Sequence, residues 1–179
     1  DCLLSRGLGD VYKRQLDQVV AAHGGVDVLV NVAGGFTWET LEGGSLASWA
    51  RMQAMNLTTA ATITQLALPM LKASAAGRVV NIGAGAGIKA GMGMGAYAAS
   101  KSGVHRLTEA LAEELAGTSV TVNAILPSII DTPTNRADMP DADFSGWVKP
   151  QAIADVIQFL ASDAARAVTG ALVPVTRGG

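Results

Sequence analysis

Tyr97 and Lys101 are the two residues of this chain whose types and spacing best suit proton-transfer chemistry. They lie four residues apart in the segment 96–115, where small and apolar residues recur at helical spacing. Both side chains are therefore expected on one face of a helix, one turn apart. An unperturbed phenol has a pKa of about 10, and a neighbouring ammonium group favours its ionised form. The pair predicts a tyrosine that can donate a proton near neutral pH.

A strand and a glycine-rich loop come before this helix and must position the pair. The strand is Arg78–Ile82 (RVVNI), and the loop 83–95 that follows it contains six glycines. Such a loop has almost no side-chain bulk, so a flat ligand can approach its backbone. The Tyr-x-x-x-Lys pattern alone is a weak signal that chance can produce. Its setting between strand, loop and helix favours catalysis.

These motifs resemble those of the short-chain dehydrogenase/reductase family, in which a strand VNI(S/G)S precedes YxxSK on a long helix. The resemblance runs from about Leu16 to Gly179. It implies an NAD(P)-dependent oxidoreductase that transfers a hydride, with NAD or NADP as cofactor and a small-molecule substrate. It implies that Tyr97 is the proton donor and that Lys101 lowers the pKa of Tyr97 and holds the nicotinamide ribose. The third catalytic residue implied is Asn56, which would hold a water linked to Lys101.

Asn56 lies inside a segment predicted to be one long helix, with Ser45 as its N-cap and an end near Ser74. Asparagine is a poor residue for a helix interior, so its presence needs a reason. The resemblance supplies one, a local kink opened by this asparagine. The alternative is a solvent-facing side chain without a function.

Two strand ends carry the motifs that the resemblance assigns to the cofactor. Asn31-Val32-Ala33-Gly34-Gly35 stands where the family has NNAG, and Val32 is a departure from it. Residues 127–132 (PSIIDT) stand where the family has PGxxxT, with Ser128 in place of glycine. Asn31 is interpreted as a structural brace more readily than as a ligand. The cofactor-binding residues implied are Asn31, Ala33, Gly34, Ile82, Tyr97, Lys101, Pro127, Ile130 and Thr132.

Ala84 stands thirteen residues before Tyr97, at the position of the family's catalytic serine. The enzyme is then inactive, uses another donor, or acts on a substrate that needs none. The segment 126–147 resembles dihydropteridine reductase, a divergent family member that also keeps Tyr and Lys and has Ala for Ser. A pteridine-like substrate is therefore one hypothesis. The alternatives are a carbonyl or 3-oxoacyl reductase and a non-catalytic relative kept for binding or oligomerisation.

Strands alternating with helices predict an α/β fold, a Rossmann-like doubly wound parallel sheet that lacks its first strands. The expected strands are 26–31, 77–82, 118–126 and 171–176, with a helix at 150–160 and a surface loop at 133–146. Ligands of such sheets bind beyond the carboxyl ends of the strands. The positions near 34, 84 and 132 all follow strand ends, which agrees with that rule.

Residues 1–15 (DCLLSRGLGDVYKRQ) show no apolar period and resemble translated adapter sequence, so we interpret them as a non-native segment. Residues 16–179 are interpreted as the C-terminal two-thirds of a family domain. The dinucleotide fingerprint GxGxxG fails on the glycine loop because positions 88, 90 and 96 are not glycine. We therefore expect weak or no cofactor binding by this chain and an open sheet edge beside the first strand. The choice between NAD and NADP stays open.

The composition excludes several other classes of protein. The 179 residues have a net charge of −2 and no basic stripe, so nucleic acid is not an expected partner. No apolar run is long enough for a membrane span. The only cysteine is Cys2, which fits a reducing cytoplasm. His23 and His105 have no metal-ligand partner nearby, so no metal is expected and both are predicted at or near the surface. The resemblance also implies a homodimer or homotetramer built on the two long helices.

Overall fold

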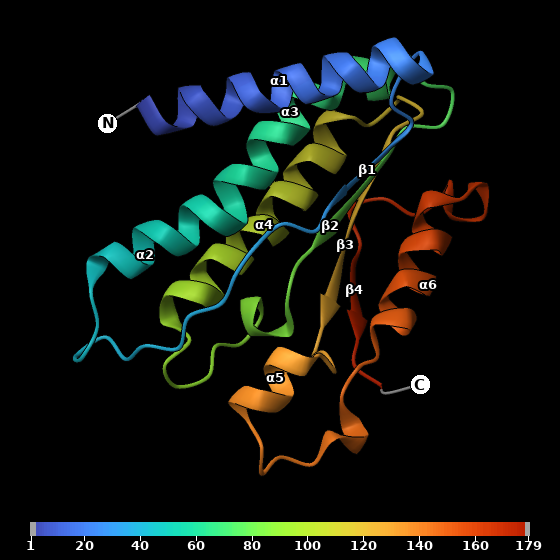
Figure 1. Cartoon of the computed structure of the whole chain (residues 1–179). Helices are drawn as coiled ribbons and strands as arrows, with labels where there is room; N and C mark the ends of the chain where they lie inside the picture. Colours follow the sequence, from blue (N-terminus) through green and yellow to red (C-terminus); the bar gives the residue numbers. More distant parts are fainter. Residues whose placement is uncertain (1–2, 178–179) are drawn as a thin grey trace.

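Four short strands form one parallel sheet in the order β1-β2-β3-β4 (Figure 1). The computed structural model describes residues 3–177, so Cys2 and the final Gly178 and Gly179 lie outside the described residues. The strands are β1 Val28–Asn31, β2 Arg78–Ile82, β3 Thr121–Pro127 and β4 Leu172–Val175. In the register between β2 and β3, Arg78 lies opposite Thr121. All four predicted strands are thereby confirmed, each with slightly shorter or shifted ends.

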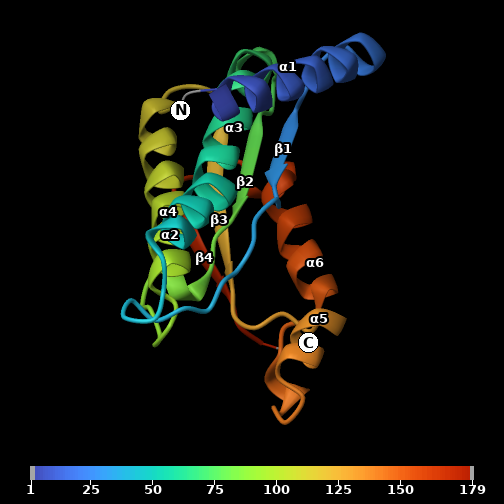
Figure 2. The same ribbon diagram turned by 60° about the vertical axis from the view of Figure 1, so that its left-hand side comes forward.

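Helices cover both faces of the sheet, as the doubly wound prediction requires (Figure 2). On one face lie α3 and α4, preceded by α2, and α1 packs across the end of α3. On the other face lies α6, while α5 stands beyond the carboxyl ends of the strands (Figure 1). The bounds are α1 Leu3–His23, α2 Leu46–Met52, α3 Thr59–Ala73, α4 Gly95–Glu114, α5 Pro133–Asp138 and α6 Pro150–Ala161.

Each face of the sheet has its own apolar core, because successive side chains of a strand point to opposite faces. Val79 and Val122 pack with α3 and α4, whereas Val80 and Ile125 pack with α6. All four are buried. Full burial of one such side chain contributes roughly 1.5–3 kcal/mol. Burial on both faces explains why apolar residues occupy both faces of the strands instead of alternating with polar ones.

The predicted helix between residues 45 and 74 is present but is not regular. Ser45 is its N-cap, as predicted, and its side chain accepts a hydrogen bond from the Ala47 amide at 3.1 Å. Between α2 and α3 the chain makes a π-helical turn, Gln53–Thr58, with Asn56 inside it. A π turn inserts an extra residue into the helix, and such turns are frequent at functional sites.

Two segments differ from their predicted form. Residues 133–146 were expected as a surface loop, but they contain α5 and a 3-10 turn, Phe144–Gly146. Thr132 caps α5 and Pro133 occupies its first turn, which is a common helix start. The segment 1–15 was interpreted as non-native, yet α1 begins within it at Leu3 and crosses residue 15 without a break, and the boundary at that residue stays a prediction.

No helix in residues 3–177 combines the length and the apolar character needed to cross a membrane. Within the sheet, β1 forms one edge, and Val28 on this strand is 40% exposed. An unpaired parallel strand edge is a site at which further strands can pair.

Candidate active site

Lys101 and Tyr97 lie in the first turns of α4, which begins directly after the glycine-rich loop. Lys101 is buried, and its Nζ donates a hydrogen bond to the carbonyl oxygen of Ile82 at 2.8 Å. Ile82 is the last residue of β2. The crossover from β2 to α4 therefore brings the Lys101 ammonium group against the carboxyl end of β2. The sequence predicts the ligand at this end of the sheet.

Asn56 reaches this site from the π-helical turn and is almost fully buried, so the solvent-facing alternative is wrong. Its Nδ2 donates to Ser100 Oγ at 2.9 Å and to the Gly35 carbonyl at 3.1 Å. Its Oδ1 accepts a hydrogen bond from the Gly35 amide at 2.8 Å. Ser100 Oγ in turn donates to the Tyr97 carbonyl at 2.7 Å. Asn56 thus joins the loop after β1 to the first turn of α4.

Gly34 lies against both Asn56 and Lys101. A Cβ built on Gly34 would be 2.6 Å from Asn56 Oδ1 and 3.5 Å from Lys101 Nζ. The first distance is shorter than real Cβ contacts allow, so only glycine fits without a shift of Asn56. The structure therefore brings together five of the predicted residues, namely Gly34, Asn56, Ile82, Tyr97 and Lys101.

Burial acts in opposite directions on the two titrating groups. It lowers the pKa of Lys101 to about 8 and raises the pKa of Tyr97, because both charged forms lose solvation. The expected lowering of the Tyr97 pKa by Lys101 is absent from this arrangement. Lys101 Nζ lies 6.0 Å from the centroid of the Tyr97 ring and is hydrogen-bonded to Ile82 instead.

Two exposed aromatic side chains stand beside the tyrosine. Phe36 packs edge-on against the Tyr97 ring, with 4.9 Å between centroids, and is 54% exposed. Trp38 lies on Gly93, where an added Cβ would collide with the indole, and Trp38 is also more than half exposed. Trp38 therefore does not cover the apolar core. Phe36 was not singled out from the sequence, where its only signal is its place directly after Gly34-Gly35.

Ala84 follows β2 at the serine position and is buried with no hydroxyl to offer. Its amide lies 3.4 Å from His105 Nε2, to which it donates. His105 is fully buried, so its predicted place near the surface is wrong. The glycine loop explains this, because a Cβ on Gly83 would be 2.7 Å from His105 Nε2. Burial, helped by Arg106, lowers the pKa of His105 and keeps the imidazole neutral.

Asn31 belongs to a buried polar chain across the sheet. Its Nδ2 donates to Thr64 Oγ1 at 2.9 Å and to Asn81 Oδ1 at 2.7 Å. Asn81 Nδ2 then donates to Thr108 Oγ1 at 2.9 Å. Both amide hydrogens of Asn31 are used inside the protein, which supports its interpretation as a brace. Ala33 lies beyond the brace and is exposed at the carboxyl end of β1.

The segment after β3 is held separately from the tyrosine. Pro127 is buried at the end of β3, and Ile130 bridges to Val148. Thr132 Oγ1 accepts from the Asn135 amide at 3.2 Å, and Asn135 Nδ2 donates to the Ile130 carbonyl at 2.7 Å. This segment and the first turns of α4 lie toward the same carboxyl end of the sheet (Figure 1). No hydrogen bond joins the segment to Tyr97 or Lys101 in the described part of the chain.

The described residues offer no cluster of side chains suited to a metal ion. Residues 3–177 contain no cluster of three or more His, Cys, Asp or Glu side chains that could hold a metal ion. The polar groups of the site are instead one ammonium, one phenol, one amide and one serine hydroxyl. This set can donate protons and bind hydroxyl groups.

Comparisons with known proteins identify relatives of this chain. The family model described as "short chain dehydrogenase" matches residues 9–143. The 3-oxoacyl-[acyl-carrier-protein] reductase FabG of Thermotoga maritima is 34% identical over 94% of this chain and 72% of that protein. The acetoacetyl-CoA reductase of Allochromatium vinosum is 32% identical over 92% of this chain and 70% of that protein. The solved structure of the Thermoplasma acidophilum aldohexose dehydrogenase superposes with a TM-score of 0.86 at 28% identity, covering 93% of this chain and 72% of that one.

Proposed function

This chain belongs to the short-chain dehydrogenase/reductase family, whose members are NAD(P)-dependent oxidoreductases, and we propose that Tyr97 is its proton donor in a reduction by NADH or NADPH. The observation that carries the proposal is the hydrogen-bonded chain from Gly35 through Asn56 and Ser100 to Tyr97, with Lys101 beside it. None of these hydrogen bonds belongs to the regular backbone bonding of a helix or a strand. Its members are positioned from three different elements.

Each residue of the site has a separate proposed task. Burial raises the pKa of Tyr97, so the phenol carries its proton at neutral pH, and donation of that proton needs a charge that stabilises the phenolate. Lys101, with a pKa of about 8, is mostly protonated at pH 7 and stabilises the phenolate that proton donation leaves. Asn56 holds the Gly35 loop and orients Ser100, and a water held near it would relay protons to Lys101.

The residues around Lys101 fit a nicotinamide nucleotide. An ammonium group has three N–H bonds, and the Ile82 carbonyl accepts only one of them, so two are free to donate to ribose hydroxyls. Gly34 and Ala33 leave open backbone beside it, and Pro127, Ile130 and Thr132 would hold the nicotinamide from the next strand end. A bound nicotinamide supplies a hydride to the substrate. Asn31 would act on the cofactor only by bracing the loop.

Ala84 and Phe36 bear on the substrate. Because no hydroxyl polarises a carbonyl at position 84, a ring C=N system that Tyr97 protonates directly suits the site. The exposed edge-on Phe36 favours a flat ring beside Tyr97. We therefore propose a pteridine-like substrate. The Thermotoga maritima and Allochromatium vinosum relatives are named as reductases of 3-oxoacyl-[acyl-carrier-protein] and acetoacetyl-CoA, so such a thioester is the second candidate.

The test uses this chain and a version extended at its N-terminus by the first strands of the Thermotoga maritima relative. Fluorescence titration with NADH and NADPH comes first, and we expect the extended version to bind and this chain to bind weakly. Turnover of quinonoid dihydropterin is then compared with that of acetoacetyl-CoA, with and without Ala84→Ser. A large gain on the thioester in Ala84→Ser favours the carbonyl substrate. No binding by either version favours the non-catalytic alternative.

Assembly is a separate proposal. Between α3 and α4, on the side away from the sheet, a groove of about 550 Å³ is lined partly by Leu68, Pro69 and Leu111. We propose that a second copy covers these two helices in a homodimer or a homotetramer. Sedimentation velocity of the chain checks this, and a monomer at all concentrations would contradict it.

A further inference from the structure

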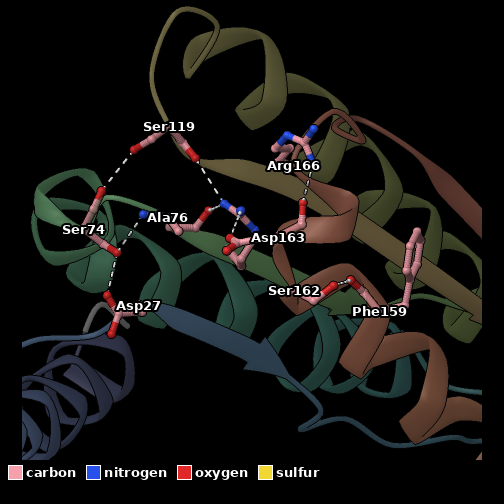
Figure 3. Close-up of polar contacts among 10 residues, drawn as sticks. Asp27, Ser74, Ala76, Ser119, Phe159, Ser162, Asp163 and Arg166 are labelled. Carbon is pink, nitrogen blue, oxygen red and sulfur yellow. Dashed lines mark hydrogen bonds and ion pairs between the residues drawn. The ribbon is translucent and has the colours of Figure 1, made fainter.

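A cavity of about 440 Å³ lies at the amino ends of β2 and β3, at the opposite end of the sheet from Tyr97. Figure 3 shows polar contacts of residues that line it, among them Ser119, Asp163 and Arg166. Arg78 and Thr121 begin these two strands and are direct neighbours in the sheet. The end of α4 and the 3-10 turn Asp163–Ala165 complete the wall, with Arg166 just after that turn. The volume is within the usual range for small-molecule sites, roughly 300–1,000 Å³.

Two buried polar atoms in this wall have no hydrogen-bond partner. They are Arg78 Nε and Thr121 Oγ1, and they are the only such side-chain atoms in the described part of the chain. The Arg78 side chain is only 3% exposed. An unsatisfied buried polar group destabilises the folded state, and a charged one does so more strongly. Two of them side by side call for a partner that the protein itself does not supply.

The charge of Arg78 is also poorly compensated. Its Nη1 donates to the carbonyls of Gly77 at 2.9 Å and Ser119 at 3.2 Å, which are neutral acceptors. Its Nη2 is 3.5 Å from a carboxylate oxygen of Asp163, whose side chain is 89% exposed. An ion pair with so exposed a partner and at that distance stabilises little. A buried guanidinium without a close anion is unfavourable.

A second arginine of this chain shows what is missing. Arg136 donates through Nε and Nη2 to the two carboxylate oxygens of Asp131, at 2.6 and 2.9 Å. In Arg78 the same edge of the guanidinium has an unpaired Nε and an Nη2 held only at 3.5 Å. This edge is the two-pronged donor that matches carboxylate and phosphate groups.

We propose that the cavity binds a small oxyanion, a phosphate or carboxylate group, on the Nε–Nη2 edge of Arg78. The Thr121 hydroxyl donates a further hydrogen bond to it, and Arg166 adds positive charge from the rim. Asp163 turns outward to solvent when the anion enters, because it competes for Nη2. This site uses no residue of the Tyr97 site, so it stands or falls independently of the proposed reductase activity.

The test follows the side-chain Nε–Hε resonances of the arginines by NMR while inorganic phosphate or acetate is added, with chloride keeping the ionic strength constant. The Arg78 signal is identified by its loss in Arg78→Lys, and the titration itself uses the unmodified chain. We expect a saturable shift of the Arg78 signal and no shift of Arg136 Nε, the internal control. Phosphate and acetate arms separate the two anion classes, and saturation by either one supports the site.

Three variants on the wall sharpen this test without removing Arg78. Asp163→Asn removes the competing carboxylate and should tighten binding several-fold, whereas Arg166→Gln should weaken it several-fold. Thr121→Val removes one hydrogen bond to an anion and should weaken binding by roughly tenfold. If Arg78 does not shift, or if Arg78 and Arg136 shift alike without saturation, then Arg78 only braces the strand ends and the proposal is wrong.

Discussion

The two ends of the sheet treat their buried polar groups in different ways. At the carboxyl ends, Asn56 and Lys101 are buried and hydrogen-bonded to Gly35, Ser100 and Ile82. At the amino ends, Arg78 and Thr121 are equally buried, yet each keeps an unpaired atom. The carboxyl end has a preorganised set of donors around a tyrosine, whereas the amino end has unpaired buried polar atoms on two residues that line a cavity.

This difference predicts that the carboxyl-end site keeps its structure without a ligand, whereas the amino-end site gains stability when a ligand binds. A satisfied network is rigid and stays in place when the ligand leaves. Unsatisfied donors carry a cost that an incoming acceptor removes, so binding there should stabilise the fold by mass action. The predictions below test the contrast from both ends.

Tyr97→Phe should cause the largest effect, a fall in turnover of roughly 10²–10⁴-fold in the N-terminally extended version, because the proton donor is lost. The Phe36 contact and the fold should remain. Steady-state kinetics and circular dichroism measure both effects, with Tyr12→Phe on α1 as the matched control. A rate within a factor of two of the unmodified protein would remove Tyr97 from the donor role.

Asn56→Leu should lower the free energy of unfolding by about 3 kcal/mol, since it leaves the Gly35 backbone groups and Ser100 without their partner. Urea unfolding of this chain measures the change. Gln53→Ala, exposed on the same π-helical turn, is the control and should cost far less. Equal losses in the two variants would mean that the network contributes no stability.

Lys101→Met should change the pH dependence of stability. The pKa of buried Lys101 is about 8, below its ordinary value of 10.5, so the folded state binds fewer protons between these pH values. The unmodified chain should therefore gain stability relative to Lys101→Met as pH rises from about 8 to 10.5, by at most about 3 kcal/mol. Urea unfolding at several pH values checks it. A pH-independent difference would show that the Lys101 pKa is ordinary.

Two threonine-to-valine changes compare the ends directly. Thr108 is buried and accepts from Asn81 Nδ2, so Thr108→Val should cost about 1–3 kcal/mol of the free energy of unfolding. Thr121 has an unpaired hydroxyl, so in phosphate-free and acetate-free buffer Thr121→Val should leave the free energy of unfolding unchanged or raise it, by up to about 3 kcal/mol. Thermal or urea unfolding decides, and a large loss in Thr121→Val would reveal a partner for that hydroxyl.

The order of elements and the meeting of Tyr97, Lys101 and Asn56 at one edge of the sheet could be predicted from the sequence. Strand ends, the Ser45 cap and the one-turn spacing of Tyr97 and Lys101 are local patterns, and local patterns follow from backbone geometry. The prediction of a surface loop at 133–146 was wrong for a local reason too. Thr132-Pro133 is a common helix start, whereas the family resemblance assigns Thr132 only to the cofactor motif.

By itself, then, the sequence determined the doubly wound parallel sheet and the edge at which Tyr97, Lys101 and Asn56 meet. Only the tertiary structure decided which atoms the side chains of these residues bond to. Asn56 bonds to Gly35, 21 residues away, and Lys101 to Ile82, 19 residues away. The unpaired edge of Arg78 likewise depends on strand register and on a turn 85 residues further along the chain. Such contacts join segments that no periodicity connects, so burial and hydrogen bonding appear only once the chain has folded.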